Sequence, residues 1–302
     1  MITDKLIDGI IATQNPTCVG LDTLFDYLPD DMKAGANTFE DVAERVLEFN
    51  KNLIDNVCDI VPSVKVQIAY YDMYGVAGMK AYYETLKYAA KKGLVVIADA
   101  KRNDIGSTAS CYAKAFLGQT QVNENSIAAF PSDYVTVNGY LGSDGILPFV
   151  EQCEKNDKGI FVLVKTSNPS GAEIQNMILD NGVPMYEYVG GLVEKWGEST
   201  IGKYGYSAVG AVVGATHPTE AARHLEVLPH TFLLIPGYGA QGGNAEMLKS
   251  CFGANGLGGV VNNSRGILCA YKKNGGTYTE AARNACIAMQ KDLSSVIGKM
   301  GK

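Results

Sequence analysis

Eight short apolar runs, separated by segments of helical periodicity, constrain the fold of this 302-residue chain more than any other feature. The runs are rich in valine and isoleucine and hold few interruptions, which is typical of strands buried on both faces. The expected strands are residues 17–22, 64–69, 94–101, 133–138, 159–165, 207–213, 231–236 and 257–262.

The segments between these runs indicate helices. Apolar residues recur at helical spacing after Thr38, and Asp41 three residues later suggests a capping box. The expected helices are residues 1–16, 39–57, 76–91, 109–117, 145–153, 185–196, 219–228, 244–252, 264–271 and 278–300.

Strict alternation of strand and helix predicts parallel strands joined by helical crossovers. Eight such units fit a closed (β/α)₈ TIM barrel, and we assign residues 1–302 to one domain of this α/β class. The alternative is an open, doubly wound sheet, but its GxGxxG fingerprint is absent after the first strand.

Composition narrows the choice of partners and compartment. The net charge of −6 argues against nucleic acid or an anionic membrane surface as the main partner. No secretory signal peptide or membrane-spanning run is recognisable. The seven cysteines are odd in number and form no CxxC pair, which favours reduced thiols in a cytoplasmic protein.

The third strand leads directly into charged residues. Five apolar residues, 94–98, run into Asp99, Lys101 and Asp104. Side chains alternate along a strand, so Asp99 and Lys101 are expected on the same side, with Asp104 in the turn beyond. Charges rarely occupy the mouth of an apolar core unless they are paired or used in function.

Other strand ends add polar groups to the same mouth, where barrel enzymes carry their active sites. Asp22 ends the first strand and Lys65 lies on the second. One interpretation is a salt-bridged rim; the other is a functional network in which Lys101 acts as a general acid. The carboxylates also suit a hard metal cation, whereas no His/Cys set supports zinc.

Two glycine-containing segments near the C-terminus predict a phosphate site. Residues 237–243 and 263–266 follow the seventh and eighth strands, where barrels of this kind often bind phosphate. Glycines let backbone N–H groups approach an anion, and Arg265 adds a guanidinium. The alternative is a flexible turn beside a surface arginine.

These motifs together resemble one enzyme family. Residues 99–108, Asp-Ala-Lys-Arg-Asn-Asp-Ile-Gly-Ser-Thr, resemble the Asp-x-Lys-x-x-Asp-Ile-x-x-Thr signature of orotidine 5'-phosphate decarboxylase. Residues 21–22, 64–67, 236–243 and 263–266 also resemble that family, in the same order. The resemblance spans about residues 19–268 and is closest to the longer form of the enzyme.

The resemblance implies a reaction and its catalytic groups. Orotidine 5'-monophosphate loses CO₂ and yields UMP, the last step of de novo pyrimidine biosynthesis, with no cofactor and no metal. Such enzymes are (β/α)₈ barrels that work as homodimers with shared active sites. By motif position, Lys65, Asp99, Lys101 and Asp104 form the charged tetrad, and Lys101 is the proton donor to C6.

The resemblance also implies the contacts to the substrate. Asp104 and Thr108 reach into the neighbouring subunit's site, while Asp22 and Lys65 contact the ribose. Ser167 contacts the pyrimidine, and Ser170 is the alternative for this role. Gln241 and Arg265 hold the phosphate.

Two other functions stay open from the sequence. Mg²⁺-dependent sugar-phosphate decarboxylases and aldolases of the same superfamily share Asp-x-Lys-x-x-Asp and a phosphate cradle. A non-catalytic barrel that binds a nucleotide for regulation is the third possibility, although a pure binder has no need of a proton donor at position 101.

Overall fold

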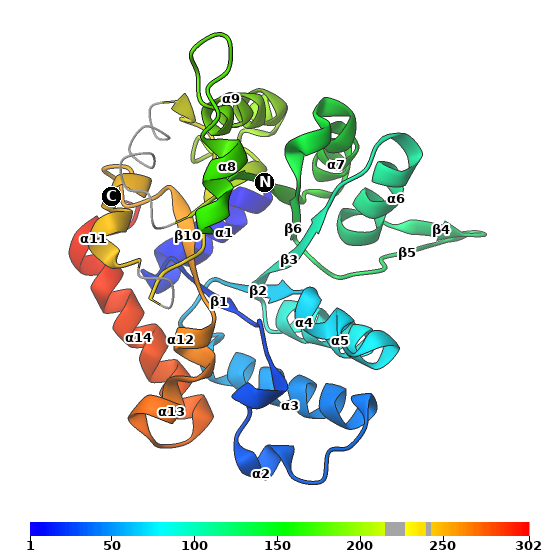
Figure 1. The fold of residues 1–302 in the computed structure, drawn as a ribbon, viewed down its shortest axis with the longest axis vertical. Coiled ribbons are helices and arrows are strands. Elements are labelled where there is room, and N and C mark those ends of the chain that lie inside the picture. The colour runs from blue at the N-terminus through cyan, green and yellow to red at the C-terminus, as the bar shows by residue number, and fades with distance from the viewer. Residues whose placement is uncertain (215–226, 240–242, 302) are drawn as a thin grey trace.

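The strands form a closed parallel barrel, as predicted (Figure 1). The computed structural model describes residues 1–214, 227–239 and 243–301. Around the barrel the strands follow the order β1-β10-β9-β8-β7-β6-β3-β2, so neighbours in the barrel are consecutive in the chain. They are β1 Thr17–Gly20, β2 Ser63–Gln67, β3 Val95–Arg102, β6 Tyr134–Val137, β7 Gly159–Lys165, β8 Val209–Val213, β9 Leu233–Ile235 and β10 Gly259–Asn263.

The longer helices α3, α5, α6, α7, α9 and α14 surround the barrel, whereas α1 crosses behind it (Figure 1). The α-helices that the structure describes are α1 Ile2–Thr13, α2 Asp30–Lys33, α3 Phe39–Val57, α4 Ala69–Asp72, α5 Gly75–Lys91, α6 Gly106–Leu117, α7 Ser143–Asn156, α8 Ala172–Gln175, α9 Met185–Gly197, α11 Ala245–Leu248, α12 Arg265–Leu268, α13 Ala270–Asn274 and α14 Tyr278–Ile297. The helix expected at 219–228 lies outside the described residues, apart from its last two positions.

Local sequence signals explain where several elements begin. The side chain of Thr38 accepts a hydrogen bond from the Asp41 backbone N–H at 3.1 Å, and the predicted capping box of α3 is confirmed. The apolar stripe of α3, which includes Val46, Phe49 and Leu53, is buried against the barrel core. Burial of this stripe stabilises the helix more than its intrinsic propensity does.

Two segments differ from the sequence expectation. The second strand ends at Gln67 rather than at residue 69, because Ile68 adopts helical backbone angles and is the N-cap of α4. The sequence predicts no helix or strand in residues 118–132, yet β4 Thr120–Val122 and β5 Asn125–Ile127 form an antiparallel hairpin. This hairpin projects away from the barrel (Figure 1).

The end of β3 is irregular where the charged motif lies. Its register with β6 shifts between Ala98 and Arg102, and Lys101 adopts a left-handed backbone with φ of 46°. A non-glycine residue in this region is strained, and such strain is concentrated at functional sites. The Thr136 hydroxyl accepts a hydrogen bond of 2.9 Å from the displaced backbone N–H of Lys101. This bond holds the bulge in place.

The structure also bears on membrane association and on the cysteines. Within the ranges that the structure describes, no helix is long and apolar enough to cross a membrane. All seven cysteines are free thiols.

Candidate active site

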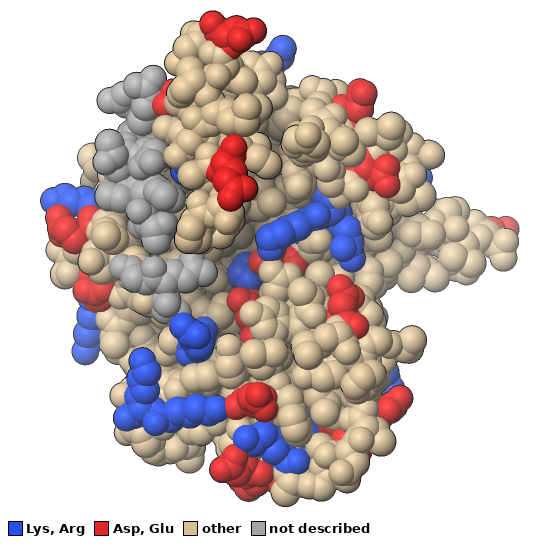
Figure 2. Space-filling view, viewed as in Figure 1, with Lys and Arg blue, Asp and Glu red and all other residues tan. Residues whose placement is uncertain are grey.

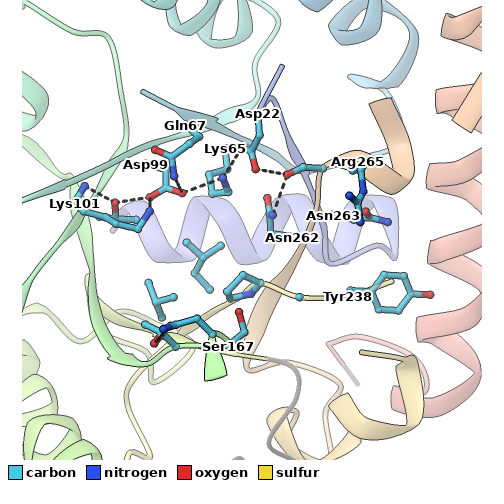
Figure 3. A pocket seen from close by; sticks show the side chains of 18 of the residues that line it. Asp22, Lys65, Gln67, Asp99, Lys101, Ser167, Tyr238, Asn262, Asn263 and Arg265 are labelled. Carbon is cyan, nitrogen blue, oxygen red and sulfur yellow. Dashed lines mark hydrogen bonds and ion pairs between the residues drawn. The ribbon is translucent and has the colours of Figure 1, made fainter. Parts of the chain in front are cut away.

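A cavity of about 460 Å³ opens at the carboxyl ends of the barrel strands (Figure 3). Figure 2 shows lysine, arginine and acidic side chains gathered around the hollow in this face. Residues from all eight strand ends contribute to the wall: Asp22, Tyr27, Lys65, Gln67, Tyr70, Asp99, Lys101, Thr136, Leu163, Thr166, Ser167, Asn168, Val212, Leu234, Pro236, Gly237, Tyr238, Asn262, Asn263, Ser264 and Arg265.

Four charged side chains form a continuous row along one wall, here termed the charge row (Figure 3). Lys101 Nζ lies 2.7 Å from Asp99 Oδ1, and Lys65 Nζ lies 3.0 Å from Asp99 Oδ2. Lys65 Nζ also lies 2.8 Å from Asp22 Oδ1. The row therefore alternates in sign, in the order Lys101, Asp99, Lys65, Asp22.

The backbone explains why these residues meet. Lys65 lies on β2, where it pairs with Ile97 of β3, and Gln67 pairs with Asp99. Adjacent parallel strands in this register bring the two charged side chains to the same end of the barrel. The prediction that Asp99 and Lys101 share a side is consistent with their contact, although a bulge rather than regular alternation brings them together.

Asp99 is the most heavily bonded member of the row. Its Oδ1 accepts from the Thr136 hydroxyl at 2.8 Å, and its Oδ2 accepts from the Gln67 amide at 2.9 Å, in addition to the two lysines. Burial alone raises the pKa of Asp99, but attraction to Lys65 and Lys101 outweighs burial and holds this pKa well below its usual value. Asp99 is therefore a carboxylate at neutral pH.

Lys65 is locked inside the row. Its side chain is only 5% exposed, whereas that of Lys101 is 45% exposed. Burial lowers the pKa of Lys65, but attraction to Asp22 and Asp99 outweighs burial and raises the pKa above its usual value. Lys65 is thus a fixed cation, and Lys101 is the more exposed of the two lysines that line the cavity.

The predicted pyrimidine contact lies across the cavity from the charge row. Ser167 follows β7 and lines the wall opposite Lys65 and Asp99 (Figure 3). The alternative, Ser170, is exposed and does not line the cavity. Gly214 is needed beside Ser167, because a Cβ atom at Gly214 would lie 2.9 Å from the Ser167 Cβ.

The predicted phosphate residues lie past the Asp22 end of the row. Arg265 is exposed, lines the cavity and is the first residue of α12. Figure 3 shows it beside Asn263. Gly237, with φ of 102°, and Tyr238 line the same end from the loop after β9. Gln241, the other predicted phosphate residue, lies outside the described residues.

The structure does not bring Asp104 or Thr108 to the cavity of their own chain. Asp104 follows β3 in a turn, as expected, but its Oδ1 accepts from the Ile105 backbone N–H at 2.8 Å. Thr108 lies exposed in the first turn of α6. The charged residues of this chain's own cavity are therefore Asp22, Lys65, Asp99 and Lys101. The roles expected for Asp104 and Thr108 in a neighbouring subunit's site stay a prediction.

Several polar residues of the site were missed as site residues. Thr136 bonds Asp99, and the Ser264 hydroxyl donates to Asp22 Oδ2 at 2.7 Å. Asn262 donates to Ser264 at 3.4 Å. The available signal was position: each lies at the end of a predicted strand, where inward-facing polar groups of a barrel collect.

The fold and cavity define a class of protein. This TIM barrel carries an alternating charge row and an arginine, Arg265, at its carboxyl mouth. Such a site is suited to hold a small anionic substrate and to catalyse proton transfer on it. Within the described residues, no three His, Cys, Asp or Glu side chains lie close enough together to hold a metal ion.

Comparison with known proteins identifies the family. Residues 17–274 match the family model described as Orotidine 5'-phosphate decarboxylase / HUMPS family. A protein of Clostridium botulinum named orotidine 5'-phosphate decarboxylase is 43% identical, covering 98% of this chain and all of that protein. Its namesake in Clostridium perfringens is 42% identical, covering 99% of this chain and all of that protein.

Solved structures agree with the sequence match. The structure titled Leishmania donovani OMP decarboxylase superposes with a TM-score of 0.75 at 27% identity, covering 98% of each chain. The chain belongs to the orotidine 5'-phosphate decarboxylase family. The resemblance seen in the sequence, to a carboxy-lyase of the (β/α)₈ barrel class, is thereby confirmed.

Proposed function

We propose that this chain decarboxylates orotidine 5'-monophosphate to UMP, the last step of de novo pyrimidine biosynthesis, without a metal or cofactor and with Lys101 as the proton donor to C6. The observation that carries the proposal is the charge row, in which Lys101 alone combines a 2.7 Å contact to Asp99 with a side chain that is 45% exposed. The family membership and the relatives' names support the reaction.

The reaction explains the need for the row. Loss of CO₂ leaves an electron pair in the plane of the pyrimidine ring, where the π system cannot delocalise it. A cation fixed beside C6 stabilises that pair and then donates its proton there. Asp99 and Lys65 position Lys101 before the reaction begins, so little reorganisation is needed during the step.

The hydrogen bonds of Asp99 favour a reaction without a metal. A carboxylate offers about four lone-pair sites. In Asp99 these meet Lys101 and Thr136 at Oδ1, and Lys65 and Gln67 at Oδ2. The lysines supply the positive charge that a divalent cation would otherwise bring, and the carboxylate has no free position for that cation.

The cavity also suggests how the nucleotide lies. Arg265 lies past the Asp22 end of the row, and Lys101 forms the other end (Figure 3). A nucleotide with its phosphate at Arg265 then places its ribose beside Asp22 and Lys65 and its base between Lys101 and Ser167. Binding energy at the phosphate, remote from C6, orders the site for the chemical step.

Product analysis tests the proposed reaction. The protein is incubated with orotidylate and, separately, with a ketose phosphate, the substrate class of the Mg²⁺-dependent relatives. We expect equal amounts of UMP and CO₂ from orotidylate. Turnover of the ketose phosphate alone would assign the Mg²⁺-dependent function, and tight UMP binding without turnover would assign a regulatory nucleotide binder.

Replacing Arg265 with alanine is expected to raise KM for orotidylate roughly 10- to 100-fold, because charge-assisted bonds to phosphate are lost. Steady-state kinetics measure the change. The matched control is Arg283→Ala, which removes an arginine paired with Asp59 on the outer surface and is expected to leave KM unchanged. An unchanged KM in the Arg265 variant would refute the phosphate role.

We also propose a homodimer with shared active sites. Asp104 and Thr108 lie outside their own cavity, and large apolar side chains are exposed in the segments after β2, β3 and β6. These are Met73, Val76, Ile105, Tyr140 and Leu141, with Val76 89% exposed. Clustered exposed apolar groups are typical of subunit interfaces. Asp104 and Thr108 would then reach the partner's site.

Mixed variants test the shared site. Lys101→Ala and Asp104→Ala chains are each expected to be nearly inactive, but an equal mixture regains activity, because half of the dimers are mixed and each mixed dimer holds one intact site. The expected recovery is about a quarter of the wild-type rate per site if subunits exchange randomly. A mixture as inactive as its components, despite subunit exchange, would contradict sharing.

Finally, we propose a cytoplasmic location. The seven free thiols support it, since four of them, Cys18, Cys153, Cys251 and Cys286, are buried in the core as reduced side chains.

A further inference from the structure

Ser264 makes a contact that the proposed reaction does not yet explain. It lies between β10 and α12, and its hydroxyl donates to Asp22 Oδ2 at 2.7 Å. Lys65 holds the other oxygen of the same carboxylate at 2.8 Å. Asp22 is therefore fixed at both of its oxygens.

The backbone of β1 leaves room for this hydroxyl. A Cβ atom at Gly20 would lie 1.9 Å from Ser264 Oγ, so any larger residue at position 20 would displace the serine. Asn262, which is 7% exposed, donates a hydrogen bond to the same hydroxyl oxygen at 3.4 Å. Glycine at position 20 and Asn262 together define where Ser264 lies.

Ser264 also belongs to the start of α12, the helix that carries Arg265. Its backbone oxygen accepts from the N–H groups of Ile267 and Leu268 at 3.0 and 2.9 Å, so it forms the first turn of α12. Arg265 is the next residue in the chain. The side chain of Ser264 thus contacts the charge row, while its backbone belongs to the first turn of the helix that carries Arg265.

We propose that Ser264 is a positioning residue, which orients the Asp22 carboxylate toward the ribose hydroxyls and couples that carboxylate to Arg265 at the start of α12. The inference rests on the proposed function, because the ribose and phosphate belong to its substrate. Ser264 acts on binding rather than on the chemical step, since its removal leaves the contacts from Asp22 to Lys65 and from Asp99 to Lys101 intact.

The first test measures kinetics and product binding. Ser264→Ala is expected to raise KM for orotidylate and Kd for UMP roughly 10- to 100-fold, because Asp22 is then no longer held in the orientation in which its charged group bonds the ribose. The kcat stays within about threefold of wild type, since the proton donor is untouched. Gly20→Ala is expected to reproduce this pattern, because its methyl group displaces the same hydroxyl.

A matched control tests whether the effect requires a serine–carboxylate hydrogen bond inside the cavity. The Ser199 hydroxyl also donates to a carboxylate, Glu154 Oε1, at 2.5 Å, but it lies outside the cavity. Ser199→Ala is therefore expected to keep wild-type KM, kcat and UMP affinity. Thermal unfolding of each variant separates a loss of fold from a loss of binding.

A double-mutant cycle gives the decisive result. If Ser264 acts through Asp22, Ser264→Ala costs little further UMP affinity in an Asp22→Asn background, so the two losses are not additive. Additive losses, or wild-type KM and Kd in Ser264→Ala, would overturn the inference. Wild-type protein that binds UMP but does not turn over orotidylate would instead refute the proposed function, and the UMP cycle would still decide the role of Ser264.

Discussion

Replacing Lys101 with alanine is expected to lower kcat more than about 100-fold, a loss of at least about 2.7 kcal/mol in transition-state stabilisation, while the fold survives. The reason is that Lys101 is the more exposed of the two lysines of the charge row, 45% exposed beside Asp99. Measurement of kcat at saturating orotidylate, with thermal unfolding as the check on folding, gives the result.

The control for this variant is a lysine in a similar pair elsewhere. Lys203 lies 3.0 Å from Asp8 on the outer surface, and its replacement with alanine is expected to leave kcat unchanged. A Lys101→Ala enzyme that retains more than about a hundredth of the wild-type kcat would contradict the proton-donor role.

Replacing Asp99 with asparagine is expected to affect both activity and stability. The variant keeps the shape of the side chain but leaves Lys65, 5% exposed, with Asp22 as its only carboxylate partner in the row. Breaking a buried ion pair from one side typically costs about 3–5 kcal/mol in the free energy of unfolding. Chemical denaturation measures that loss, and kcat is expected to fall more than about 100-fold because Lys101 loses its anchor.

A surface pair provides the matched comparison. Asp59 pairs with Arg283 at 2.6 Å, but its side chain is 59% exposed. Asp59→Asn is therefore expected to change the free energy of unfolding by less than about 1 kcal/mol. Equal losses in the two variants would show that the charge row adds nothing beyond an ordinary surface pair.

The stability difference between wild type and Asp99→Asn also depends on pH. The folded pKa of Asp99 is lowered, so the unfolded chain takes up the proton first as the pH falls. The difference is thus fully present above the unfolded pKa of about 3.9 and declines below it. Denaturation at pH 3 to 8 checks this. A difference that instead vanishes between pH 5 and 8 would contradict the assignment.

The barrel was predictable because its strands are buried on both faces. Runs such as residues 94–98 and 159–164 are apolar without interruption, and parallel strands in a barrel require that pattern. The hairpin of β4 and β5 was not predictable, because its three-residue strands are mostly polar and their residues are all exposed. No apolar face distinguishes those residues from a loop.

The candidate site was predictable in part for the same reason. Lys65 and Asp99 stand out because each interrupts an apolar run, and unpaired charges are costly there. Thr136 and Ser264 were missed, because their position near a strand end was the only signal, and a hydroxyl does not interrupt an apolar run as a charge does. The left-handed backbone of Lys101 could not be predicted, because it depends on a tertiary contact, the hydrogen bond from its backbone N–H to Thr136.

Metal independence is tested most directly by the rate of loss of orotidylate absorbance with purified protein in excess EDTA. We expect steady decay to UMP at the same rate before and after chelation, and no gain when Mg²⁺ is restored. A rate that falls to zero in EDTA and returns with Mg²⁺ would contradict the claim that the charge row, rather than a metal ion, supports the reaction.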